Sequence, residues 1–211
     1  MVRIQTIDEQ INIYMSTLKV NAIEKKDADQ TLTVKDATLT GATTFPAGHI
    51  LQVQSTTKTD ADYNISVAAN TTSGEVITGL TVTLTPTAIT NNVLVQGMVF
   101  IGHSDPDQYL SLALILWRNG AVLEGARADA ASNRTRVTSA NTYLSQTGLF
   151  TTIPFIFQDS PNSISAQTYG IELFHARGTT STIYINRSGR DTDAAYDARG
   201  ISTITAMEIQ G

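Results

Sequence analysis

From His49 to the C-terminus, the chain is a succession of short β-favouring segments that recur about every ten residues. Most are separated by Gly, Pro, Asn or Asp, the residues that favour turns. Regular short strands with turn signals, and no good helix among them, predict an all-β, jelly-roll-like β-sandwich. The expected strands are His49–Lys58, Tyr63–Ala68, Val76–Thr85, Asn92–Gly102, Tyr109–Arg118, Ala121–Ala126, Arg134–Ser139, Thr147–Gln158, Ala166–Ala176, Ser181–Arg187 and Ile201–Ile209.

Two local patterns strengthen this prediction. Asn119-Gly120 separates two β-favouring segments, and Asn-Gly is a strong signal for a two-residue hairpin. Thr81–Thr85 and Ser202–Ile209 alternate polar with apolar residues, which predicts strands with one buried and one solvated face.

The composition agrees with a β-rich chain and excludes several kinds of protein. Threonine (32 residues) and serine (15) are abundant, and charged residues make up 16%. Threonine is β-branched and suits a half-buried pleated surface. The absence of cysteine excludes a disulfide scaffold or a thiolate site. The net charge of -5 favours no nucleic-acid partner, and no apolar run is long enough for membrane insertion.

The first 28 residues are predicted to form a helical anchor or coiled coil. Apolar residues there follow the 3–4 spacing of a coiled-coil seam, which then ends at Asn21 and Lys25. So short a helix needs partners, so the seam predicts trimerisation. An amphipathic helix packed on its own domain, or a short strand over Arg3–Asp8, are the alternatives. The predicted trimerisation residues are Ile4, Ile7, Ile11, Tyr14 and Leu18.

Residues 29–45 are predicted to form a short β-repeat shaft. They alternate Leu, Val and Phe with Thr, Lys, Asp and Gly, but they hold too little apolar material to close a core within one chain. An extended linker is the alternative. Pro46-Ala-Gly48 punctuates the chain, so the head domain is predicted to span residues 46–211.

No metal or cofactor site is expected. His49, His103 and His175 lie in or beside predicted strands, with no second histidine at ligand spacing. His103 with Asp105 and Asp107 could form a loop metal site, but Pro106 favours an ordinary turn. The segment DTDAAYD (residues 191–197) begins like a calcium loop, but it lacks the later ligands and is predicted to be a solvated acidic loop.

The chain is not expected to be an enzyme. It contains no nucleophile elbow and no phosphate-binding loop. Glu124, Glu172 and Glu208 are scattered singly, so no carboxylate pair indicates glycoside hydrolysis. The arginines at 127, 134 and 136 are balanced by acids, which favours a solvated loop or an inter-subunit ion pair over phosphate binding.

Two tyrosines in polar loops are candidate receptor contacts. Tyr143 lies in the turn-rich segment Asp129–Tyr143, and Tyr196 lies in Ser188–Arg199. Their rings could stack on sugars, and the neighbouring Arg, Asp and Asn could bond sugar hydroxyls. We expect both segments at the end of the head farthest from the N-terminal anchor, although both could be ordinary surface loops.

Five stretches, in order, resemble the C-terminal domain of many bacteriophage fibre and appendage proteins, common in phages of aquatic bacteria. They are FPAGHILQVQSTTKTDADYNIS, GLTVTLTPTAITNNVLVQGMV, LWRNGAVL, QDSPNSISAQTYGIELF and TIYINRSG with RGISTITAMEI. The preceding QTLTVKDATLTGATTF is similar to the β-repeat shaft of the same proteins.

The resemblance implies a virion structural protein, usually a homotrimer, with a β-sandwich head and no catalytic residues. The expected partners are other phage virion proteins, bound through the N-terminal segment, and a host surface glycan or protein. The short N-terminal part fits a short tail fibre or baseplate appendage that contacts a host receptor. A capsid-surface decoration (head fibre or cement) protein is the alternative, and a glycan-active enzyme is a third.

Overall fold

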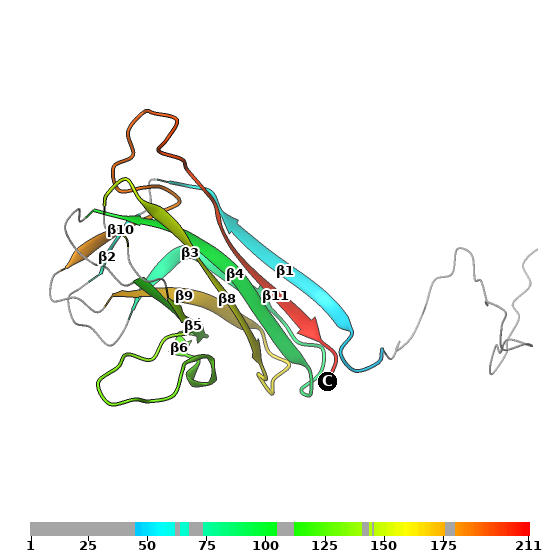
Figure 1. Cartoon of the computed structure of the whole chain (residues 1–211). Helices are drawn as coiled ribbons and strands as arrows, with labels where there is room; N and C mark the ends of the chain where they lie inside the picture. The colour runs from blue at the N-terminus through cyan, green and yellow to red at the C-terminus, as the bar shows by residue number, and fades with distance from the viewer. Residues whose placement is uncertain are drawn as a thin grey trace, which may run out of the picture. The chain divides into compact units, whose positions relative to one another are not determined.

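The computed structural model describes residues 45–61, 64–67, 74–104, 112–140, 144, 146–175 and 180–211. These residues form an antiparallel two-sheet β-sandwich (Figure 1). The predicted all-β sandwich is therefore confirmed. The helix expected in residues 1–28 and nearly all of the shaft expected in residues 29–45 lie outside the described ranges.

Each sheet is assembled from strands distant in sequence. Sheet A consists of β1 (Ile50–Lys58), β11 (Ser202–Ile209), β4 (Asn92–His103), β8 (Phe150–Asp159), β10 (Ser181–Ile185) and β2 (Asn64–Val67). Sheet B consists of β3 (Glu75–Leu84), β9 (Gln167–His175), β5 (Leu112–Arg118), β6 (Ala121–Val122) and β7 (Ser139–Ala140).

Strand β4 organises sheet A. One of its edges pairs with β11 over Asn92–Met98 and then with β10 over Ile101–His103. Its other edge pairs with β8 over Val93–Gly102. Beyond β11 lies β1, whose Ile50 is opposite Ile209 and whose Lys58 is opposite Ser202. In sheet B, β9 lies between β3 and β5.

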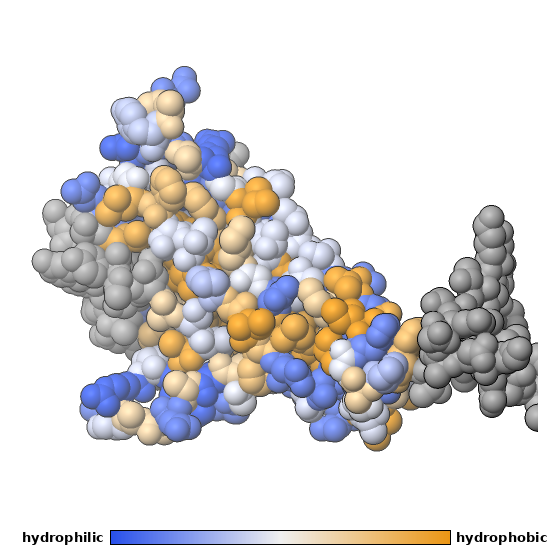
Figure 2. Space-filling model, turned by 45° about the vertical axis from the view of Figure 1, so that its right-hand side comes forward, coloured by the Kyte–Doolittle hydropathy of each residue, from blue (hydrophilic) through white to orange (hydrophobic). Residues whose placement is uncertain are grey.

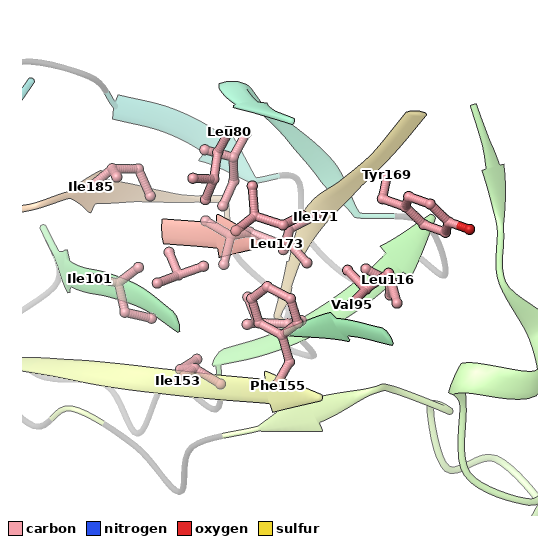
Figure 3. Packing of buried hydrophobic residues seen from close by; sticks show 14 of the residues in the cluster. Leu80, Val95, Ile101, Leu116, Ile153, Phe155, Tyr169, Ile171, Leu173 and Ile185 are labelled. Carbon is pink, nitrogen blue, oxygen red and sulfur yellow. The ribbon is translucent and has the colours of Figure 1, made fainter. Parts of the chain in front are cut away.

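The alternation predicted for Ser202–Ile209 is present in the sandwich. Ser202, Ile204, Ala206 and Glu208 are buried, and the intervening side chains are partly exposed. The facing inner positions of both sheets fill one apolar core. In Figure 3, Ile101, Ile153 and Phe155 of sheet A lie between the sheets with Leu116, Ile171 and Leu173 of sheet B. Burial of such side chains contributes about 1.5–3 kcal/mol each.

A buried polar cluster joins the two sheets near one end of the core. Asp159 on β8 accepts a hydrogen bond from the Tyr169 hydroxyl (2.8 Å) and pairs with the Arg118 guanidinium (2.5 Å). Burial and the neighbouring Asp159 carboxylate both raise the pKa of Tyr169, so its hydroxyl keeps its proton and donates.

The predicted Asn119-Gly120 hairpin is confirmed. Both residues have positive φ, 51° and 79°, as a primed two-residue turn requires, and Arg118 is directly opposite Ala121. The strand predicted over Ala121–Ala126 is shorter than expected. It ends at Val122 and is followed by a 3₁₀ turn, η1 (Glu124–Ala126).

The strand predicted over Arg134–Ser139 is wrong for most of its length, because β7 contains only Ser139 and Ala140. Residues 127–138 instead form a loop beside sheet B. Val137 packs there against a small buried cluster, Ala113, Ile115 and Phe174, on that sheet's outward side. Val137, one of the residues that suggested a strand, therefore covers this cluster from a loop.

Candidate functional site

The two ends of the sandwich differ in what they carry. The chain enters at Phe45, and the Gly48 amide bonds the Gln210 carbonyl, so this entry end also holds the C-terminus (Figure 1). Residues 186–201, which we call the distal loop, precede Ser202. Because Ser202 pairs with Lys58 at the other end of β1, the distal loop lies at the opposite end. It is the orange-red loop at the top of Figure 1.

Hydrogen bonds to strand ends close the base of the distal loop. The Asn186 side-chain amide is buried and donates to the carbonyls of Lys58 and Asp60, and its oxygen accepts from the Ser202 hydroxyl. The Gly200 amide donates to the Asn186 carbonyl (2.9 Å). A Cβ on Gly189 would lie 1.8 Å from the His103 carbonyl oxygen, so only glycine fits there.

A buried aspartate holds the interior of the loop. The Asp197 carboxylate pairs with the Arg190 guanidinium at 2.7–3.2 Å and accepts hydrogen bonds from the Thr192 amide and hydroxyl and from the Ser188 hydroxyl. The Arg190 hydrogen bonds, followed by that of Thr192, hold the pKa of Asp197 well below its ordinary value. The carboxylate therefore stays charged and bonded at neutral pH.

Asp191 adds a second ion-pair cluster. Its carboxylate lies 2.8 Å from Arg199 and 3.6 Å from Arg187. The prediction of a solvated acidic loop is therefore wrong for Asp191 and Asp197, because neighbouring arginines in the chain neutralise both. The loop is folded around its charges, and it lines a hollow of about 620 Å³.

Tyr196 lies on this framework and is 67% exposed, the largest exposed fraction among the large hydrophobic and aromatic residues that the structure describes. The Arg190 guanidinium carbon is 4.7 Å from its ring centroid, at cation–π distance. The same arginine thus binds buried Asp197 and supports the exposed ring. The predicted contact Tyr196 therefore lies on a loop held by ion pairs, whereas Tyr143 lies outside the described residues.

The other predicted contact segment is not at the distal end. Of Asp129–Tyr143, the structure describes residues 129–140, and this loop is tied to the outward side of sheet B by Val137 and by the Thr138 amide, which donates to the Leu114 carbonyl. Glu124 pairs there with Arg127 and Arg136, both at 2.9 Å. The expectation that both segments share one end is therefore wrong, because Val137 draws this loop onto the flank of the sheet.

The entry end contains a site that the sequence did not reveal. Glu208 is fully buried, and its carboxylate accepts hydrogen bonds from the Thr87 amide and hydroxyl, the Asn91 amide and the Gln52 amide, all at 2.6–2.7 Å. Burial alone would raise the pKa of Glu208, but the hydrogen bonds outweigh it and the pKa is lowered. Four donors around one carboxylate make a structural anchor for the β3–β4 loop.

The remaining candidate residues do not converge on a reactive centre. His49 stacks on Phe45, and His175 is buried and bonded to the Val67 carbonyl. His103 is also buried, whereas Asp105 and Asp107 are outside the described residues. Within the described ranges, no group of three or more His, Asp or Glu is placed to bind a metal ion. No helix there is long and apolar enough to cross a bilayer.

The three glutamates considered for glycan cleavage lie in different surroundings. Glu124 pairs with arginines, and Glu208 is enclosed by amides and a hydroxyl. Glu172 lies on β9, where burial and then the charge of nearby Glu75 raise its pKa against the hydrogen bond from the Gly74 amide. Arg127, which pairs with Glu124, also acts electrostatically on Glu172, so these two glutamates share one arginine as a neighbour, and the non-enzyme interpretation stays a prediction.

No family model matches the sequence, and no curated protein matches it at a significant level. Among solved structures, infectious bursal disease virus (Gt strain) has a TM-score of 0.43 and 18% identity over 86% of this chain and 42% of that chain. The VP2 subviral particle of that virus has a TM-score of 0.38 and 15% identity over 85% and 46%.

The tripod from the baseplate of bacteriophage Tuc2009 has a TM-score of 0.29 and 15% identity over 90% of this chain and 84% of that chain. The chain spans less than half the length of the two bursal disease virus chains. These are distant structural similarities, all to viral or phage proteins, and at such scores they assign no function to this chain.

Proposed function

We propose that this chain is a bacteriophage virion structural protein. In this proposal it forms a homotrimeric short tail fibre or appendage, is anchored to other virion proteins through its N-terminal segment and presents the sandwich to a host receptor. The ordered resemblance in sequence to phage fibre and appendage proteins supports the protein class. The trimer rests on the seam predicted from Ile4 to Leu18.

The jelly-roll assignment within the sandwich is part of this proposal. It is supported by the strand order β1-β11-β4-β8 in sheet A facing β3-β9-β5-β6 in sheet B. Successive strands alternate between the two layers over much of the chain, as they do when a folded ribbon wraps into two Greek keys.

One observation carries the receptor role: an ordered, ion-paired loop lies at the end opposite to where the chain enters, and it exposes an aromatic ring. A loop already fixed by Asp197 and Asn186 loses little conformational entropy on binding, which favours affinity. Tyr196 offers a ring for stacking, and Asp193 and Arg199 line the hollow of the same loop with polar groups. Because single sugar contacts are weak, three equivalent sites would add avidity.

The test compares adsorption of the purified chain to host cells and to envelope glycans. Tyr196→Ala should reduce adsorption at least tenfold, Tyr196→Phe should retain most of it if the ring stacks, and Tyr143→Ala tests the second candidate separately. Ile164→Ala is the matched control, because Ile164 is 61% exposed in the β8–β9 loop at the entry end. All variants must melt cooperatively at the wild-type temperature.

Adsorption unchanged by Tyr196→Ala would remove the distal loop from the receptor site. No binding by the intact protein across host envelopes would instead favour the capsid-decoration alternative, in which the same trimer covers the particle without contacting a receptor.

A further inference from the structure

The outward face of sheet A lacks charge across four neighbouring strands. Its outward positions are every second residue of four strands. They are Val53, Ser55 and Thr57 of β1, Thr203, Thr205 and Met207 of β11, Leu94, Gln96, Met98 and Phe100 of β4, and Thr152, Pro154, Ile156 and Gln158 of β8. They carry Thr, Ser, Gln, Pro, Val, Leu, Ile, Met and Phe, and none carries an ionisable side chain. We call this surface the neutral face.

Large apolar side chains are exposed on the neutral face. Ile156 is 64% exposed, Val53 51% and Met98 38%, and Phe100 stacks on Phe150 with ring centroids 4.8 Å apart. A groove of about 620 Å³ is lined by residues of the face, among them Met98, Ile156 and Thr205, and extends to Thr138 and Ser139 at β7 of sheet B. The register places apolar rows at Val53–Met207–Leu94 and at Met98–Pro154, and between them lies the row Ser55–Thr205–Gln96–Ile156, which is polar but uncharged except for its isoleucine.

This distribution differs from an ordinary solvated surface. Single exposed apolar residues are common, but a contiguous apolar area marks an interaction site. Interface cores are depleted in charge, as this face is. The charged residues gather elsewhere, in the distal loop and around Glu124. Figure 2 shows one side of the molecule, on which hydrophobic and weakly polar residues predominate in the middle with a few strongly hydrophilic ones among them, and further hydrophilic residues lie on the projecting loops and along the lower edge.

A second copy of the chain fits this face better than a sugar or a charged partner. The face has no ionised group to pair with charge. In a trimer, neutral faces turned toward the three-fold axis would each contact parts of both neighbours, where their threonine, serine and glutamine groups can bond one another. Four strands spaced about 4.8 Å apart and about six residues long span roughly 400 Å². A stable complex buries about 800 Å² on each partner, so the face alone would associate weakly.

Weak association suffices when another contact holds the copies together. Strand β1 begins five residues after Phe45, so chains joined through the preceding residues would keep their neutral faces within a short length of chain. Such tethering raises the effective concentration to about the millimolar range. We propose that the neutral face is the contact between the sandwiches of neighbouring copies, an inference that rests on the homotrimer of the proposed function.

The test uses thiol labelling of the full chain, which contains no cysteine of its own. Ile156→Cys places a thiol on the neutral face, and Ile164→Cys places one on the β8–β9 loop. The two native side chains are matched in exposure within one chain, 64% and 61%. Labelling rates and light-scattering mass are measured on the same samples over a dilution series.

We expect a mass near three times 22.7 kDa and labelling of Ile156→Cys at least tenfold slower than labelling of Ile164→Cys. This protection should be lost when dilution yields monomer. A multimer in which both variants react equally fast would overturn the neutral face and leave the homotrimer standing. A monomer in which both react fast would overturn self-association itself, whereas slow labelling of Ile156→Cys in a monomer would show that another segment of the same chain covers the face.

Discussion

Replacing Glu208 by Gln tests whether the buried carboxylate anchors the entry end of the sandwich. The substitution keeps the shape of the side chain but removes its charge and turns one oxygen into an N–H donor. In the wild-type protein three donors approach Oε1, and the Gln52 amide approaches Oε2. After the change, the new amide faces the Gln52 amide, donor against donor.

The magnitude follows from these contacts. Hydrogen bonds to a charged group contribute about 1.5–3 kcal/mol each, against about 0.5–1.5 kcal/mol for neutral ones. Gln52 can turn its oxygen toward the variant only by giving up its bond to the Thr85 carbonyl. Glutamine is neutral, so the variant does not bury a charge, and this offsets part of the stability lost with the hydrogen bonds. We therefore expect the free energy of unfolding to fall by about 2–4 kcal/mol, which lowers the Tm by roughly 4–16 °C for a domain of this size.

Urea and thermal unfolding of the full chain measure this loss. Glu124→Gln is the matched control, because Glu124 also has two partners but is 64% exposed, and exposed pairs contribute only about 0–1 kcal/mol. Since the folded-state pKa of Glu208 is lowered, its contribution is complete above its ordinary value of 4.5 and declines as the pH falls through the folded value. The difference between wild type and variant should therefore shrink below pH 4.5. Equal stability of Glu208→Gln and Glu124→Gln at pH 7 would refute the reasoning.

Three further predictions concern the core, the distal loop and the domain boundary. Tyr169→Phe removes the buried hydrogen bond to Asp159 and should cost about 1–2 kcal/mol in urea unfolding, while an unchanged midpoint would show that this hydrogen bond does not stabilise the sandwich. Gly189→Ala places a Cβ against the His103 carbonyl and should cost about 1–3 kcal/mol, whereas Gly125→Ala, with its nearest contact at 3.5 Å, should cost less than about 1 kcal/mol; similar losses would argue against a closely packed loop base. Residues 46–211 expressed alone should be soluble with β-type circular dichroism, and an insoluble or unstructured product would move the boundary.

The sequence predicted most strands because their signals are local. Alternation in Ser202–Ile209 and the Asn119-Gly120 turn require only neighbouring residues, and both are present in the structure. The Arg134–Ser139 prediction failed because Val137 finds its apolar partners, Ile115 and Phe174, across the chain rather than in a sheet register. No local pattern reports such a partner.

The same distinction applies to the candidate site. Tyr196 was identified from its polar loop, and the loop's order could have been foreseen, since Arg190 and Arg199 flank the aspartates within ten residues. The Glu208 anchor could not, because Gln52, Thr87 and Asn91 meet the carboxylate only after β1, β4 and β11 align. The neutral face likewise becomes visible only when the register places alternate residues of four strands on one side.

The central claim is that this chain is a virion structural protein. Its most direct test is a cryo-electron microscopy reconstruction of the particle of the phage whose genome encodes the chain. The proposal predicts density for the sandwich in groups of three, with the Phe45 end toward the particle and the distal loop facing outward. Three-fold density on the tail or baseplate would support the fibre or appendage, and three-fold density on the capsid would support the decoration alternative. Absence of the chain from the purified particle would contradict a virion structural role altogether.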